Sequence, residues 1–179
     1  MGNRQAVIFC SASSSIDPKY NQAARELVRA LHALGYSVTS GGGKIGTMGA
    51  ITDESIRLGG SHVAVLPGFM KGLENPGVSE VVWTETMSTR KERMRLGCDV
   101  AIALPGGIGT LDEVIETLVL RKLHRWEGEV YLLNIDGFYD PLVTLLDHYV
   151  TTRMMEPEDR ALVHVADTPA QLAEMLKGV

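Results

Sequence analysis

The sequence is poor in the residues that mark secreted and metal-binding proteins. It has two cysteines in 179 residues, Cys10 and Cys98, and they lack the spacing of a disulfide scaffold or a zinc site. Its five histidines are scattered, and none forms an i, i+4 ligand pair with another. We therefore expect no metal site.

Strong charge and long apolar runs are also missing. The net charge is −5, with no basic tail, so broad electrostatic binding to nucleic acid is not expected. No apolar run approaches the ~20 residues that span a bilayer. The apolar stretch 6–9 is too short for the core of a signal peptide. These absences predict a cytoplasmic protein without a membrane partner.

Short apolar runs alternate with helical patterns along the chain, which is long enough for one domain. The pattern predicts strands at 6–10, 36–40, 62–66, 78–85, 100–104, 130–134 and 162–165. It predicts helices at 18–34, 47–58, 87–97, 110–125, 139–153 and 169–177. Such alternation favours right-handed βαβ units. We expect an α/β fold: a single Rossmann-like, three-layer α/β/α domain over 1–179 with a mostly parallel sheet.

The segment 105–110, Pro-Gly-Gly-Ile-Gly-Thr, follows one predicted strand and opens a helix. Glycines at such a position let backbone N–H groups converge on an anion. Glu113 then places a carboxylate in the first helical turn. A second interpretation is structural, because Thr110 and Glu113 have the spacing of a capping box. Phosphate binding and helix capping both remain open for this segment.

A basic cluster lies at the start of the preceding helix. Thr89 and Glu92 have capping-box spacing, which would place Arg90 and Lys91 in the first turn. Cations there oppose the helix dipole, and an anionic ligand would compensate them; the alternative is a solvated basic face. With the glycine segment they would form a pocket for a phosphorylated small molecule. A nucleoside 5′-monophosphate fits, since a carboxylate can stabilise the oxocarbenium-like state through which its N-glycosidic bond breaks.

An earlier glycine cluster, 41–46, reads Gly-Gly-Gly-Lys-Ile-Gly and formally matches a dinucleotide fingerprint. That fingerprint requires an acidic residue about 20 positions later, and the stretch 65–68 has none. Thr47 also stands where a P-loop requires lysine. A nicotinamide-dependent oxidoreductase is therefore disfavoured. The cluster is either a tight turn or a backbone surface that contacts a nucleotide or phosphate.

Taken together, the motifs resemble the Lonely Guy family of cytokinin-activating phosphoribohydrolases. The likeness is carried by Met87-x-x-Arg90-Lys91 and by the pattern Pro-Gly-Gly-x-Gly-Thr-x-x-Glu at 105–113. Segments 41–49 and 132–139 extend it over nearly the whole chain. The resemblance implies a homodimer that hydrolyses a nucleoside 5′-monophosphate to a free base and ribose 5-phosphate, with no cofactor.

The resemblance also assigns roles to residues. Arg90 and Glu113 match the catalytic pair. Glu74, in a more divergent loop, aligns with a substrate-contacting acid. The other implied substrate contacts are Lys91, Gly106, Gly107, Gly109 and Thr110.

Three departures from the family pattern leave the substrate open. They are Ser11-Ala12 after the first strand, Thr47 in the first glycine cluster, and the polar segment 120–129. AMP and a cytokinin nucleotide are both candidate substrates. The alternative is a non-catalytic carrier of a phosphorylated ligand, as in the similar molybdenum-cofactor carriers. The old label of lysine decarboxylase lacks support, because no motif for a Schiff-base lysine or its pyridinium partner is found.

Overall fold

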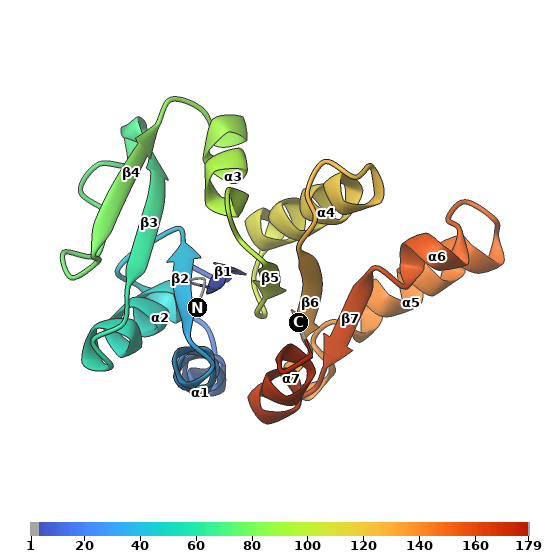
Figure 1. Cartoon of the computed structure of the whole chain (residues 1–179), viewed down its shortest axis with the longest axis horizontal. Coiled ribbons are helices and arrows are strands. Elements are labelled where there is room, and N and C mark those ends of the chain that lie inside the picture. Colours follow the sequence, from blue (N-terminus) through green and yellow to red (C-terminus); the bar gives the residue numbers. More distant parts are fainter. Residues whose placement is uncertain (1–3, 179) are drawn as a thin grey trace.

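Seven parallel strands form one sheet in the computed structural model, which describes residues 4–178 (Figure 1). The strand order is β4-β3-β2-β1-β5-β6-β7, and every neighbouring pair is parallel. This confirms the predicted α/β fold. The strands are β1 (Arg4–Phe9), β2 (Tyr36–Ser40), β3 (His62–Pro67), β4 (Glu80–Thr84), β5 (Val100–Ala103), β6 (Glu129–Leu133) and β7 (Val163–Ala166).

Helices cover both faces of the sheet, with α1, α2 and α7 on one side and α3, α4 and α5 on the other (Figure 1). All six predicted helices are present, with ends shifted by a few residues, and the short α6 and two 3₁₀ turns were not predicted. The helices are α1 (Pro18–Ala33), α2 (Gly46–Arg57), α3 (Met87–Arg95), α4 (Ile108–Lys122), α5 (Asp140–Thr151), α6 (Pro157–Arg160) and α7 (Pro169–Leu176), and the turns are η1 (Gly68–Met70) and η2 (Ile135–Gly137).

The central strand β1 supplies both hydrophobic cores. Ile8 points toward α1 and α7, whereas Phe9 packs with the helices of the opposite face. This alternation follows from the pleat of a strand, which directs successive side chains to opposite faces. Both side chains are almost completely buried. The sheet is therefore covered on both sides, as parallel sheets usually are.

The strand order reverses beside β1. From β1 the chain adds β2, β3 and β4 on one side, and then crosses over to place β5 against the other side of β1. In open α/β sheets, ligands bind beyond the carboxyl ends of the strands at such a switch point. The residues that follow β1, β2 and β5 lie at this edge.

Residues 4–178 hold neither a helix that could span a membrane nor a cluster of side chains that could bind a metal ion. No helix in that range is long and apolar enough to cross a bilayer. No group of three or more His, Cys, Asp or Glu side chains in the same range could hold a metal ion.

Candidate active site

A cavity of about 470 Å³ opens at the switch point, where loops after β1 and β5 meet the start of α3. Its wall combines backbone from the second glycine segment, two serines, three methionines and one ion pair. The lining residues are Cys10, Ser11, Ala12, Ser13, Met48, Met70, Met87, Arg90, Gly107, Ile108, Gly109, Thr110 and Glu113.

The ion pair is formed by Arg90 on α3 and Glu113 on α4. The Arg90 Nη1 donates to Glu113 Oε1 at 2.7 Å, and the Arg90 Nε donates to the carbonyl of Val65 at 3.0 Å. Both residues are only 7% exposed. The structure thus brings together the two residues that the sequence nominated as a catalytic pair, on the wall of one cavity.

Burial and the Arg90 side chain have opposite effects on the pKa of Glu113. Burial raises the pKa of its carboxyl above the usual range, and the charge and hydrogen bond of Arg90 offset part of that rise. Asp112 raises the pKa further, while Lys91 lowers it. Glu113 therefore binds a proton more readily than an exposed glutamate does.

The predicted capping box at the start of α4 is wrong. The helix begins at Ile108, its N-cap is Gly107, and no side chain caps it. Glu113 consequently lies in the second turn. Its carboxylate accepts from Arg90 rather than reaching back to Thr110, because a buried guanidinium offers a stronger, charge-assisted bond. The first residues of α4, whose N–H groups lack partners within the helix, line the cavity.

The predicted start of α3 at Met87 is confirmed, but the predicted cap is wrong. Thr86, not Thr89, is the N-cap, and these two threonines form a reciprocal capping box with bonds of 3.1 Å. Arg90 and Lys91 therefore lie in the second turn, beyond the strongest part of the helix dipole. Carboxylates of α4 compensate them, so the dipole argument for an anionic ligand does not hold here. The start of α4 remains as the anion-binding feature of the cavity.

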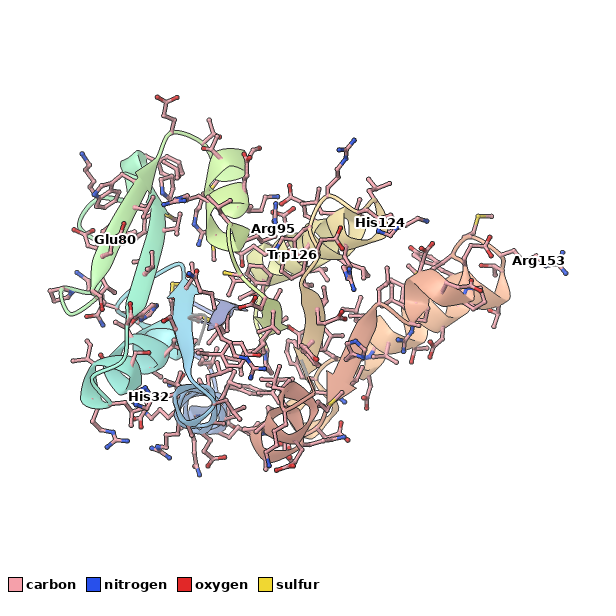
Figure 2. All side chains as sticks on the ribbon, viewed as in Figure 1. His32, Glu80, Arg95, His124, Trp126 and Arg153 are labelled. Carbon is pink, nitrogen blue, oxygen red and sulfur yellow. The ribbon has the colours of Figure 1, made fainter. Side chains whose placement is uncertain are left out.

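Lys91 lies behind the cavity wall. Its Nζ pairs with Asp112 at 2.8 Å and with Glu116 at 3.1 Å, and Arg95 also contacts Glu116 at 3.0 Å. Arg95 is in turn tied to the polar segment before β6, because Trp126 Nε1 donates to the Arg95 carbonyl at 3.2 Å (Figure 2). Among the described residues, Lys91 is not part of the cavity lining.

The glycines at the start of α4 have different roles. A Cβ on Gly106 would lie 2.2 Å from Thr110 Oγ1, so Gly106 makes room for that buried side chain. A Cβ on Gly107 or Gly109 would meet nothing within 4 Å. Both glycines line the cavity, and they keep the N–H groups at the helix start accessible to a ligand.

Glu74 lies apart from the ion pair. Its carboxylate accepts the Gly72 N–H at 2.6 Å within its own loop, and its backbone forms an antiparallel bridge with Gly43. It is absent from the described residues that line the cavity. The structure therefore does not bring it together with Arg90 and Glu113.

A second, smaller cavity of about 230 Å³ shares part of its wall with the first. The two have Ala12, Met48, Met70 and Arg90 in common. The rest of the smaller cavity is mostly apolar and uses the first glycine cluster and the loop after β3. Those residues are Gly41, Gly43, Lys44, Ile45, Leu66 and Leu73. The sequence analysis did not predict this smaller cavity. The two methionines beside the glycine-rich loops, Met48 and Met70, could have indicated it.

The loop after β1, where the sequence departs from the family pattern, also lines the cavity, although none of its residues was among the predicted site residues. Ser11 and Ser13 line the cavity opposite the start of α4, and Ser11 Oγ accepts the Ser13 N–H at 3.1 Å. Cys10 precedes them, and burial raises the pKa of its thiol, which keeps it protonated. The position of these polar residues directly after a buried strand could have indicated them.

These features define a Rossmann-like α/β protein with a buried arginine–glutamate pair beside a glycine-rich helix start. The family model described as "Possible lysine decarboxylase" matches residues 48–176. A "Probable cytokinin riboside 5′-monophosphate phosphoribohydrolase" of Oryza sativa subsp. japonica is 36% identical over 97% of this chain and 72% of its own length. A cytokinin riboside 5′-monophosphate phosphoribohydrolase of Arabidopsis thaliana is 34% identical over 97% of this chain and 83% of its own length. The chain therefore belongs to the Lonely Guy family, as its motifs predicted.

Solved structures support the fold. The molybdenum cofactor carrier protein of Chlamydomonas reinhardtii has a TM-score of 0.76 at 21% identity, covering 99% of this chain and 98% of that one. The molybdenum cofactor binding protein of Rippkaea orientalis has a TM-score of 0.75 at 23% identity, with the same coverage. At these identities the likeness concerns the fold alone.

Proposed function

We propose that this protein hydrolyses the N-glycosidic bond of a nucleoside 5′-monophosphate, releasing the base and ribose 5-phosphate. The observation that carries the proposal is the buried 2.7 Å contact between Arg90 and Glu113 on the wall of the main cavity. A carboxylate placed beside an anion-binding helix start suits a substrate whose reacting bond lies close to its phosphate. The family relatives, which are named as phosphoribohydrolases, support the same reaction class.

In this proposal the phosphate binds at the start of α4. Gly107 and Gly109 leave room beside the backbone N–H groups, and the positive end of the helix dipole favours a negative group there. The ribose would then extend toward Glu113, which lies one turn further along α4. Ser11 and Ser13 supply hydroxyl groups on the opposite wall.

The chemistry requires Glu113 to be ionised. Its carboxylate stabilises positive charge at C1′ as the bond to the base breaks, and it accepts a proton from the attacking water. The water oxygen forms the new bond to C1′, while the bonding electrons leave with the base nitrogen. The base nitrogen takes up a proton from solvent, and Glu113 returns the water proton to solvent, which restores its carboxylate. Arg90 orients the carboxylate and offsets the effect of burial on its pKa. The sum is one nucleotide and one water converted to base and ribose 5-phosphate.

We propose a cytokinin riboside 5′-monophosphate as the substrate, with AMP as the comparison. The apolar second cavity shares Arg90 with the main one, so a base lying across the site could place an apolar substituent in it. Met70 and Leu73 would contact that substituent. The names of the relatives support this choice over unmodified AMP.

The test is base release from a panel of nucleoside monophosphates, separated by chromatography, with nucleosides and diphosphates as controls. Glu113→Gln should fold and bind nucleotide but release no base. Glu116→Gln is the matched control, because it lies on the same helix and its side chain is 35% exposed. Full activity in Glu113→Gln would refute the catalytic assignment. Tight nucleotide binding without turnover in the wild-type protein would favour the carrier alternative.

We also propose that the protein is a homodimer, as the family resemblance implies. One face of α4 supports this assembly, because exposed apolar side chains recur on it at helical spacing. These residues are Ile108, Leu111, Val119 and Leu123. Sedimentation should show that Val119→Glu yields monomers, while Leu145→Glu on α5 does not. Wild-type monomers at micromolar concentration would contradict the proposal.

A further inference from the structure

The first glycine cluster borders the proposed substituent cavity, and its first residue also lies against Arg90 of the proposed catalytic pair. It follows β2 and borders the apolar cavity. A Cβ on Gly41 would lie 2.5 Å from Arg90 Nη2 and 2.9 Å from both Sδ and Cε of Met48. The Arg90 guanidinium thus occupies the space that any side chain at position 41 would need.

The other sides of the guanidinium are fixed by hydrogen bonds. The Val65 carbonyl in β3 holds Nε at 3.0 Å, and Glu113 on α4 holds Nη1 at 2.7 Å. Gly41 closes the third side with bare backbone. Arg90 therefore lies in a slot built from three separate elements, and only one of its walls depends on the absence of a side chain.

We propose that Gly41 is a positioning residue, whose missing side chain allows Arg90 to reach Glu113 in the geometry that the reaction uses. The catalytic consequence rests on the proposed function. The steric coupling between positions 41 and 90 does not, and it can be measured separately. The first glycine of the formal dinucleotide match at 41–46 then provides clearance for an arginine.

The neighbouring glycines make the test specific. Gly42 has a φ of +63°, and a Cβ there would lie 2.0 Å from Ala64 Cβ, so substitution at 42 disrupts the fold itself. Gly43 borders the same cavity as Gly41. Its Cβ would lie 3.0 Å from Met48 Sδ, but Arg90 is not among its nearest neighbours. Neither Gly41 nor Gly43 has a left-handed φ, so alanine at either position tests contact without backbone strain.

The first experiment compares Gly41→Ala with Gly43→Ala in steady-state kinetics. Gly41→Ala should lower kcat by about ten- to a hundredfold, the range expected for a catalytic group displaced by about 1 Å. Gly43→Ala should change KM only, because it alters the cavity wall without moving Arg90. Equal losses of kcat in both variants would overturn the proposal.

The pH profile provides a second readout. The groups that face Glu113 are Arg90 and Lys91 from α3, Asp112 on its own helix, and the Cys10 and Tyr139 side chains from the loops after β1 and β6. Only Arg90 should move in Gly41→Ala. Weakening its contact raises the pKa of Glu113, so the acid limb of kcat should shift to higher pH in Gly41→Ala and stay in place in Gly43→Ala. An unshifted limb in Gly41→Ala contradicts the proposal.

A double-mutant cycle separates this inference from the proposed function. Lysine has no atom at the position of Nη2, and only the contact with Met48 remains, so alanine at 41 should lower Tm more in the Arg90 protein than in the Arg90→Lys protein. If Gly41→Ala alone fails to fold, Arg90→Lys should restore folding. Equal Tm losses in both backgrounds, or no rescue, would refute the inference. If the Tm losses show that positions 41 and 90 are coupled but the wild-type protein releases no base, the steric inference stands and the enzyme assignment is rejected.

Discussion

Removing Arg90 should destabilise the protein by an amount that grows with pH. In Arg90→Leu the Glu113 carboxyl stays buried without its partner, and the Val65 carbonyl loses a donor. Removing one partner of a buried ion pair costs about 3–5 kcal/mol when the remaining group stays charged. Glu113 can lose its charge by taking up a proton, so the cost depends on pH.

The size of this pH dependence follows from the hydrogen bond between Arg90 and Glu113. A hydrogen bond to a charged group contributes about 1.5–3 kcal/mol, and one pKa unit corresponds to about 1.4 kcal/mol. The pKa of Glu113 should therefore rise further in Arg90→Leu than in the wild type, because the charge and hydrogen bond that lower it are removed. A carboxyl whose folded pKa lies above its unfolded value is stabilising below the unfolded value, and that stability is lost as pH rises. The difference in unfolding free energy between variant and wild type should grow by about 1.5–3 kcal/mol as pH rises from the unfolded-state pKa of Glu113 through its folded-state pKa.

Urea unfolding at several pH values between 5 and 8 measures this difference. Arg95→Leu is the matched control, because Arg95 is also buried but its partner Glu116 has a side chain that is 35% exposed and keeps Lys91. Glu116 can be solvated, so the cost of Arg95→Leu should not vary with pH. A flat difference for Arg90→Leu, or the same slope in both variants, would refute the electrostatic account of the pair.

Three further predictions concern other parts of the chain. Thr86→Ala should cost about 1 kcal/mol in chemical denaturation, because Thr86 caps α3, and Glu92→Gln should cost nothing measurable. Gly107→Ala should leave Tm unchanged but raise the KM for nucleotide several-fold, since its methyl group would enter open space beside the anion-binding N–H groups. The buried Glu54 carboxylate has a pKa lowered from 4.5 to about 2, with its bond to the Arg57 guanidinium as the largest cause. The stability it supplies should be present above pH 4.5 and be lost as pH falls toward 2. Because its arginine partners are half exposed, we expect a loss of about 1–2 kcal/mol, measured against Glu54→Gln.

The sheet and the helices were predictable because their signals are local. Buried strands such as β1 and β5 read as short apolar runs, and glycines such as Gly35, at a φ of 80°, mark helix ends. Helix caps were less predictable. The sequence pattern indicated Thr89 as the cap of α3, whereas Thr86 caps it, and the choice between them depends on geometry that no local pattern encodes. The same holds for Glu113, whose partner Arg90 lies 23 positions away.

The charges of the basic cluster on α3 are compensated within the protein, which the sequence analysis did not predict. Arg90, Lys91 and Arg95 face the carboxylates of α4, not the dipole of their own helix. Four contacts result across the helix pair: Arg90–Glu113, Lys91–Asp112, Lys91–Glu116 and Arg95–Glu116. A sequence window around either helix shows only half of this arrangement, so charge compensation between the helices was not predictable from either half.

The four contacts differ in what they can contribute to stability. The carboxylate side chains of Asp112 and Glu116 are 56% and 35% exposed, so their pairs resemble surface salt bridges, which contribute about 0–1 kcal/mol. Glu113 is 9% exposed by the same measure, and the desolvation of such a pair can cancel its attraction. An apolar pair at positions 90 and 113 would serve stability equally well. The one contact that stability explains least is also the one that lines the cavity, and its burial is what the proposed role in catalysis requires.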